Sequence, residues 1–365
     1  MPVVIEKPSL WARLSPWLRG FDGLLMAIVA LLALAGLITM YSSGYDHGTR
    51  FADHGRNMVL AFGLMFLVAQ VPPQRLMTLA VPMYAAGVAL LVAVALFGIT
   101  KKGATRWLNV GVTIQPSEIL KIAMPLLLAW WFQKREGQLR ALDFVVGGLL
   151  LALPVGLIMK QPDLGTALLV LAAGLSVLFF AGLRWRLVLP PVLLGVVVIV
   201  LVLSFESELC ADGVRWVVLR DYQQQRICTL LDPAKDPLGK GFMQGTQTHL
   251  EFIPERTTDF IFAAYSEEFG LAGNLLLITA FGALVLRTLS IALDAPTLFA
   301  RLLAGAMAMM FFCYAFVNMG MVSGILPVVG VPLPFISYGG TAMVTIGVAL
   351  GMLMSIARAK RLVQT

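Results

Sequence analysis

Apolar and polar residues alternate along this chain in long blocks, not in the short periods of a soluble domain. A helix needs about 20 apolar residues to cross the hydrocarbon core of a bilayer, and about ten runs approach that length here. They are residues 22–43, 57–71, 76–99, 117–133, 142–159, 163–181, 186–204, 261–290, 300–323 and 340–357. The pattern predicts an all-α polytopic membrane protein that forms one domain over residues 1–365.

One large polar segment, residues 205–260, interrupts this pattern between the seventh and eighth predicted spans. It ends in Phe252-Ile253-Pro254-Glu255-Arg256-Thr257-Thr258-Asp259-Phe260 and then returns to apolar sequence. Charged side chains are costly where a chain enters a membrane and usually mark a functional site. Asp259, in the first turn of the next helix, is the candidate acid or base, or else an ordinary acidic residue that complements the helix dipole.

The composition supports a membrane protein, since 59% of the residues are apolar and only 13% are charged. Soluble domains are nearer 45–50% apolar and about 25% charged. The net charge of +7 comes without a basic run or a nucleic-acid-binding motif, so no nucleic-acid partner is expected. The absence of Walker A and Rossmann fingerprints disfavours a nucleotide cofactor and ATP-driven transport.

The distribution of Lys and Arg predicts the orientation, because short cytoplasmic loops are enriched in these residues. With ten spans, the side that holds both termini collects most of them, which places the termini in the cytoplasm and residues 205–260 outside. Several cations remain on the outer face or in the long loop, namely Arg50, Arg56, Lys101, Lys102, Arg106, Lys240 and Arg256. They could bind an anionic ligand such as a lipid phosphate, or contact ordinary headgroups.

Two further motifs combine charge with a predicted helix start. Glu118 and Lys121 follow Pro116-Ser117 and share one helix face. They could form a buried ion pair that fixes packing, or the polar wall of a substrate cavity. Asp163, in Lys160-Gln161-Pro162-Asp163-Leu164-Gly165-Thr166, has the position of a helix N-cap.

The uncharged segment from Ile325 to Thr341 contains three prolines and several glycines, so a continuous helix is not expected there. Non-helical backbone at membrane depth is tolerated where protein buries it or where it lines a cavity. Ser337 and Tyr338 could present hydroxyl groups to a ligand from this segment. The predicted helix after Asp259 carries Glu267 and Glu268, at least one of which should face the protein interior.

Cysteines and histidines indicate no metal site. Cys210 and Cys228 both lie in the polar segment and could pair in an oxidising compartment, whereas Cys313 lies in an apolar run. The three histidines, His47, His54 and His249, have no metal-ligand spacing and are expected to be solvated loop residues.

These motifs together resemble the SEDS family, the shape, elongation, division and sporulation proteins. The resemblance rests first on Pro332-Leu333-Pro334-Phe335-Ile336-Ser337-Tyr338-Gly339-Gly340-Thr341, preceded by Asn318 and Pro327. It extends over nearly the whole chain. The further motifs are Arg106-Trp107-Leu108, Pro116-Ser117-Glu118 with Lys121, Lys160 to Thr166, Tyr222 to Arg226 and Asp236-Pro237-Leu238-Gly239. Gly245-Thr246-Gln247 and the Glu255-Arg256 motif are closer to the elongation (RodA) type than to the division (FtsW) type.

The resemblance implies a peptidoglycan glycosyltransferase of the bacterial cytoplasmic (inner) membrane that polymerises lipid II. The family's catalytic aspartate maps onto Asp259, which would act as general base in an inverting transfer. The substrate-binding candidates are Arg50, Arg56, Lys101, Lys102, Arg106, Glu118, Lys121, Asp163, Lys240, Glu255, Arg256, Ser337 and Tyr338. A divalent cation, Mg²⁺ or Mn²⁺, could assist the cations at the pyrophosphate. The implied partners are a class B penicillin-binding protein and other membrane proteins of the elongation machinery.

Two departures from the family pattern bear on this activity. Thr257 stands where the family usually has His, and Gly239 runs directly into Lys240-Gly241, where most members carry an additional segment. The shortened outer loop could impair catalysis, or the chain could work with a rearranged loop. The alternatives to an enzyme are a lipid II flippase, which needs no base, and a non-catalytic scaffold of the elongation machinery.

Overall fold

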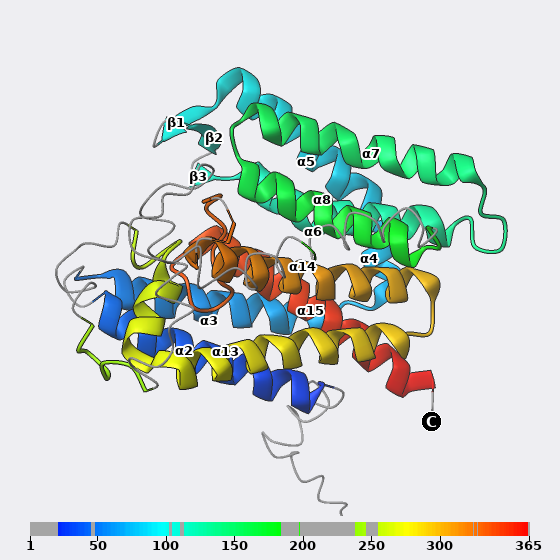
Figure 1. Ribbon diagram of the computed structural model, residues 1–365. Helices are drawn as coiled ribbons and strands as arrows, with labels where there is room; N and C mark the ends of the chain where they lie inside the picture. Colours follow the sequence, from blue (N-terminus) through cyan, green and yellow to red (C-terminus); the bar gives the residue numbers. More distant parts are fainter. Residues whose placement is uncertain are drawn as a thin grey trace, which may run out of the picture.

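The computed structural model describes residues 21–44, 48–101, 104–109, 113–183, 197, 238–245, 255–323, 325–326 and 328–363. Long helices dominate these residues and run side by side along one direction (Figure 1). The helices are α2 (Gly23–Ser43), α3 (Arg50–Ala69), α4 (Pro73–Thr78), α5 (Ala80–Phe97), α6 (Pro116–Gln133), α7 (Ala141–Lys160), α8 (Leu164–Phe180), α13 (Ile261–Leu293), α14 (Leu298–Val322) and α15 (Gly340–Val363).

Every predicted span except 186–204, of which only residue 197 is described, overlaps one of these helices. In the described part of the chain, six helices are long and apolar enough to cross a membrane: α2, α5, α7, α13, α14 and α15. Many large apolar side chains on them face outward, as Leu142 on α7 and Leu286 on α13 do. An apolar exterior suits lipid as the solvent, so the chain is a multi-pass membrane protein.

Two boundaries differ from the sequence prediction. Helix α3 begins at Arg50 and not at 57, so Arg50 and Arg56 lie on a helix and not in an outer loop. The predicted span 76–99 is divided into α4 and α5 at Leu79. Because α3 opens with polar residues, hydropathy alone missed its first two turns.

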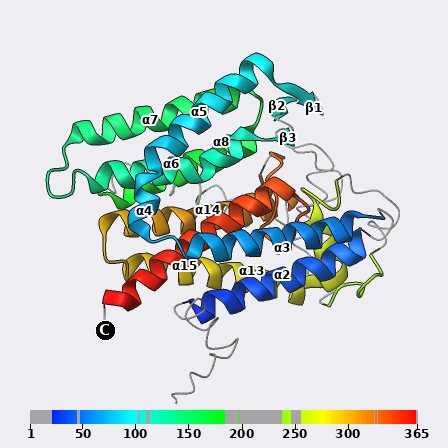
Figure 2. The same ribbon diagram turned by 180° about the vertical axis from the view of Figure 1, so that it is seen from behind.

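The fold is mostly helical, as predicted, with a small antiparallel sheet that the sequence did not predict. Its strands are β1 (Ile99–Lys101), β2 (Ala104–Asn109) and β3 (Thr113–Ile114), in the order β1-β2-β3 between α5 and α6. The sheet lies at the end of the bundle opposite the C-terminus (Figures 1 and 2). It places Arg106, on β2, at that end.

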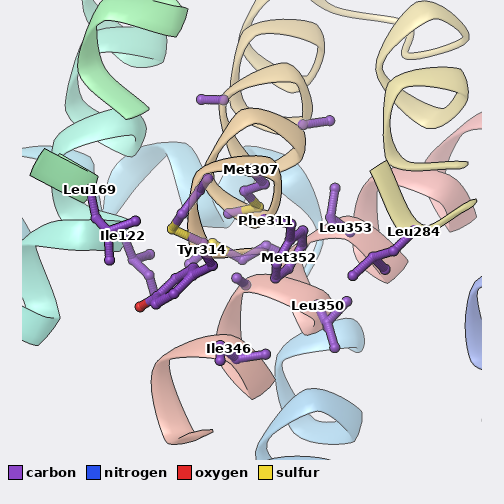
Figure 3. Close-up of a cluster of buried hydrophobic side chains, with 14 of the residues drawn as sticks. Ile122, Leu169, Leu284, Met307, Phe311, Tyr314, Ile346, Leu350, Met352 and Leu353 are labelled. Atoms are coloured by element: carbon purple, nitrogen blue, oxygen red, sulfur yellow. The ribbon is translucent and has the colours of Figure 1, made fainter. Parts of the chain in front are cut away.

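Helix α14 lies at the centre and packs against α6, α8, α13 and α15. Figure 3 shows Met307, Phe311 and Tyr314 of α14 among Ile122, Leu169, Leu284 and residues of α15. A helix that is apolar all round is expected to be buried, and this core agrees with that expectation.

The proline-rich segment after α14 is non-helical over the described residues up to Gly339, as predicted. It folds back onto the bundle at the end that carries the sheet (Figure 1). A Cβ at Gly36 of α2 would lie 2.1 Å from the Phe335 carbonyl oxygen, and one at Gly165 of α8 would lie 2.5 Å from that of Val329. The segment therefore packs backbone to backbone against two helices, which only glycine permits.

Helices α3 and α15 are in similarly close contact, and this generates a first prediction. A Cβ at Gly347 would lie 2.4 Å from the Ala61 carbonyl oxygen, so Gly347→Ala should force the helices apart. We expect a loss of about 1–3 kcal/mol, which is typical of overpacking. Thermal unfolding in detergent measures it. Gly282→Ala on α13, where nothing lies within 4 Å, is the matched control. Equal unfolding temperatures for the two variants would contradict the prediction.

Candidate active site

Asp259 lies in a turn over residues 255–260 and not, as predicted, in the first turn of the helix, because α13 begins at Ile261. Glu255 opens the turn with φ of +52°, and its carbonyl oxygen accepts hydrogen bonds from the amides of Thr258 and Phe260 at 3.0 and 3.3 Å. Thr258 also donates its hydroxyl to the Glu255 carboxylate at 3.0 Å. The turn leaves the Asp259 side chain half-buried, so it can reach a ligand.

The turn is joined to the proline-rich segment by backbone and side-chain contacts. The Tyr338 amide donates to the Thr257 carbonyl at 2.8 Å. Asn318 of α14 donates its side-chain amide to the carbonyls of Asp259 at 3.0 Å and Val331 at 2.7 Å. A Cβ on Gly330 would lie 3.4 Å from Asp259 Oδ2, so the backbone of this segment passes beside the carboxylate.

Arg50 is the predicted cation that the fold brings to this turn. From the first turn of α3 it donates to the Thr257 hydroxyl, and its guanidinium lies 5.9 Å from the centre of the Tyr338 ring. Arg256 is buried in the turn, whereas Glu255 is exposed. Arg50, Glu255, Arg256, Asp259 and Tyr338 therefore belong to one site, at the end of the bundle that carries the sheet.

A second polar cluster surrounds Asp163, which caps α8 as predicted by accepting from the Thr166 amide at 3.3 Å. Gln115 donates to its other carboxylate oxygen, Oδ2, at 2.8 Å, and an Arg106 nitrogen lies 3.6 Å from the Oδ1 atom that caps the helix. Gly165, in the next turn of α8, contacts Val329 of the proline-rich segment. The two clusters thus approach the same stretch of backbone, the start of α8 at Val329 and Asp259 at Gly330.

Glu118 and Lys121 form the predicted pair, but deep inside the bundle. Their ammonium–carboxylate distance is 2.5 Å, and the Lys121 side chain is 2% exposed. Lys121 also donates to the Tyr314 hydroxyl at 3.0 Å, and Thr345 donates to the other Glu118 oxygen at 3.1 Å. The pair joins α6 to α14 and α15, which favours the packing role over a cavity wall.

Other predicted site residues are engaged elsewhere. Arg56 is largely exposed and pairs with Asp53 at 3.1 Å. Ser337 is buried and accepts from the Leu333 amide at 2.7 Å, which closes a turn of its own segment. Lys102 and the side chain of Lys101 lie outside the described residues.

Residues 238–245, which precede Asp259 in the chain, pack onto a kink in α13. At Gly270 the helix has φ of +58° and ψ of −153°, which frees carbonyl groups in the preceding turn. The amides of Lys240 and Gly241 donate to the Glu267 and Glu268 carbonyls, both at 3.0 Å. The Lys240 ammonium reaches the Glu267 carboxylate at 2.6 Å. Glu268 is buried, as predicted for one of the two glutamates, and accepts from Ser42.

The described residues contain no group of three or more His, Cys, Asp or Glu that could hold a metal ion. Cys313 is a free thiol on α14, and Cys210 and Cys228 lie outside the described residues. His54 was expected to be solvated, and this was wrong. It is fully buried on α3, with its ring nitrogen 3.1 Å from the Phe335 carbonyl oxygen.

The chain is similar in sequence to a known protein family and to characterised proteins. The FtsW/RodA/SpoVE family model, described as cell cycle protein, matches residues 22–244 and 238–362. The two matches meet at the shortened loop. The chain is 42% identical over 355 residues to the peptidoglycan glycosyltransferase MrdB of Escherichia coli strain K12, covering 91% of this chain and 92% of that protein.

Solved structures show the same fold. The rod shape determining protein RodA of Thermus thermophilus is 28% identical with a TM-score of 0.71, over 94% of this chain and 98% of that chain. A chain from work on polymerization and crosslinking by a peptidoglycan synthase complex is 31% identical with a TM-score of 0.72. That match covers 94% of this chain and 99% of the other.

The buried ion pair generates a prediction that separates its two possible roles. Lys121→Met leaves the Glu118 carboxylate without its cation, and breaking a buried pair costs about 3–5 kcal/mol. The double variant Lys121→Met with Glu118→Gln removes both charges and should recover much of that loss. Thermal unfolding of the purified variants measures both effects. If Lys121→Met unfolds like the unmodified protein, the pair does not stabilise the packing and the cavity-wall alternative gains support.

The docked loop generates another prediction. A Cβ on Gly239 would lie 2.5 Å from both the Glu268 carbonyl oxygen and the Gly270 amide nitrogen, so Gly239→Ala should displace residues 238–245 from α13. Hydrogen exchange at the Lys240 and Gly241 amides should then become faster. Gly182→Ala is the control, because its φ of +116° is also unfavourable for alanine but nothing lies within 4 Å. Unchanged exchange in Gly239→Ala would show that the loop is not held by these contacts.

Proposed function

The chain belongs to the FtsW/RodA/SpoVE family, and from this membership we propose that it is a peptidoglycan glycosyltransferase that polymerises lipid II, with Asp259 as its general base. The observation that carries the proposal is the position of Asp259. Its half-buried carboxylate lies where the chain re-enters the bundle, beside the backbone of Gly330 and in the same turn that Arg50 contacts. A charged group in such a place is expected to be functional.

In the proposed reaction Asp259 takes the proton from the 4-hydroxyl of the acceptor sugar. The hydroxyl oxygen forms a bond to the anomeric carbon of the donor, on the face opposite its pyrophosphate. The carbon–oxygen bond to the pyrophosphate breaks, and the leaving group takes the electron pair. The α-linkage of the donor thus becomes a β-1,4 linkage. One base is sufficient, because a pyrophosphate leaving group needs no protonation.

The cations of the site have a role in this scheme. Arg50, which contacts the turn of Asp259, and Arg106, which lies beside Asp163, would stabilise the charge that develops on the leaving pyrophosphate. Guanidinium groups suit this purpose because they bind phosphate oxygens in pairs. Lys101, Lys102 and Lys240 are further candidates from the outer loops.

A divalent cation, Mg²⁺ or Mn²⁺, would neutralise part of the pyrophosphate charge if it is bound. The described residues offer it no cluster of three acidic, His or Cys side chains. Such an ion would therefore take most of its ligands from phosphate oxygens and water, as Mg²⁺ commonly does. The proposed roles of Asp259 and the arginines do not depend on it.

The shortened loop is compatible with activity in this proposal. Residues 238–245 pack on α13 through two backbone hydrogen bonds and an ion pair, which supports a rearranged loop over a defective one. A class B penicillin-binding protein is the proposed partner, together with other elongation-machinery membrane proteins. The proposed location is the inner membrane, with both termini cytoplasmic.

The proposal is tested with the purified full-length protein and fluorescent lipid II. Asp259→Asn keeps the shape of the side chain but removes the base, so polymerisation should fall by roughly 10²- to 10⁴-fold. The control is Glu136→Gln, which changes an exposed carboxylate between α6 and α7 at the opposite end of the bundle. Glycan products are resolved on gels over time.

The polymerisation assay, together with an assay of lipid II movement across vesicle membranes, separates the enzyme from the flippase. Polymerisation by Asp259→Asn at the rate of the unmodified protein would rule out the assigned base. A protein that makes no polymer but moves lipid II across vesicle membranes would be the flippase instead.

A further inference from the structure

Asn318 is an amide inside an otherwise apolar stretch of α14, and its side chain is completely buried. Its Nδ2 atom lies 3.0 Å from the Asp259 carbonyl oxygen and 2.7 Å from that of Val331. Its Oδ1 atom is also buried, and no hydrogen bond reaches it within the described part of the chain. The side chain therefore keeps one polar atom unsatisfied while the other makes two hydrogen bonds.

The chemistry of these contacts requires a primary amide. Both acceptors are backbone carbonyls, and a single nitrogen must donate to the two of them. A leucine has no donor, an ionised aspartate has only acceptors, and a serine has one hydrogen to give. Leaving the Oδ1 atom buried without a partner is unfavourable. A side chain selected only for packing would not need to carry it.

The two hydrogen bonds join the parts of the site that must be aligned. Asp259 belongs to the turn before α13, and Val331 belongs to the proline-rich segment beside it. Gly330, the residue before Val331, is the backbone that passes beside the Asp259 carboxylate. Fixing both carbonyls to one amide on the central helix therefore fixes the main chain from which the carboxylate extends, relative to that segment.

We propose that Asn318 is a positioning residue of the glycosyl transfer, one that clamps the main chain of Asp259 to Val331 and so aligns the carboxylate with the acceptor hydroxyl. This inference rests on the proposed function. Small displacements of a reacting group reduce rates strongly, because proton transfer requires hydrogen-bond geometry. The residues proposed to hold the pyrophosphate, Arg50 and Arg106, lie on α3 and β2, outside the two segments that the clamp joins.

The test variant is Asn318→Leu, which has nearly the same volume and removes the donor together with the unsatisfied oxygen. We expect kcat for lipid II polymerisation to fall roughly 10- to 100-fold, the effect of a misplacement of about 1 Å. KM should stay within about twofold, because ground-state binding is retained. Asn274→Leu is the matched control, since Asn274 lies beyond the kink on α13 and contacts the Ser266 hydroxyl. It should retain the activity of the unmodified protein.

A double variant tests whether Asn318 acts through the base. In an Asp259→Asn background, Asn318→Leu should reduce the residual rate no further, because the group it positions has gone. An additional tenfold loss there would overturn the inference. So would an Asn318→Leu enzyme with unchanged kcat, or an equal loss of kcat in Asn274→Leu.

Hydrogen exchange tests the clamp without any activity. Loss of the two hydrogen bonds should speed exchange in residues 255–263 and 328–334 together, and the Asn274→Leu control should leave both unchanged. Increased exchange in both segments would support the clamp even if the unmodified protein made no polymer, a result that would overturn the proposed function alone. Unchanged exchange in both segments of Asn318→Leu would overturn the clamp.

Discussion

The site depends on one constraint, which is that non-helical backbone at the end of a membrane bundle must find its hydrogen-bond partners inside the protein. The segment between α14 and α15 meets this constraint through its own turn at Ser337 and through Asn318 and Thr257. It also needs room, which Gly36 and Gly165 provide by letting it approach two helices. Because Thr257 is one of these partners and Asn318 also donates to the Asp259 carbonyl, satisfying the segment also places the acidic residue. The hydrogen bonds that satisfy this backbone therefore also hold the residue that is proposed to be the base.

Much of the fold could be predicted because hydropathy and proline content act locally. In the described residues the long apolar runs form helices, and the segment that holds Pro332 and Pro334 does not continue α14. The sequence prediction was wrong where contacts between distant parts of the chain determine the start of an element. Helix α3 starts at Arg50, a residue that contacts Thr257, far away in the sequence. The sheet between α5 and α6 is made of strands too short to show a period. Asp259 lies in a turn before α13, and this turn begins at Glu255 with a positive φ. The pattern of residue types does not predict a positive φ at a glutamate.

The candidate site was predicted in its residue types but not in its grouping. Spacing correctly paired Glu118 with Lys121, yet it could not show that Tyr314 and Thr345 surround them from other helices. Those neighbours favour the packing role, because the polar groups of the pair already have hydrogen-bond partners within the protein. Arg50, by contrast, joins the turn of Asp259 only through the folded chain. The sequence also contains a signal for Asn318, because a lone amide in an apolar helix indicates a buried polar contact.

The shortened loop before Asp259 contacts α13 at the kink at Gly270. A kink exposes carbonyl groups that a straight helix would satisfy, and such groups need donors. The Lys240 and Gly241 amides provide them, and Gly239 fits against the same turn without a side chain. The first part of α13, which follows Asp259 directly, is therefore held at its far end by residues 239–241 and at its near end by Asn318. A chain that lacks the additional segment can thus still fix the helix that follows Asp259, because residues 239–241, which border the shortened part of the loop, make the contacts with α13.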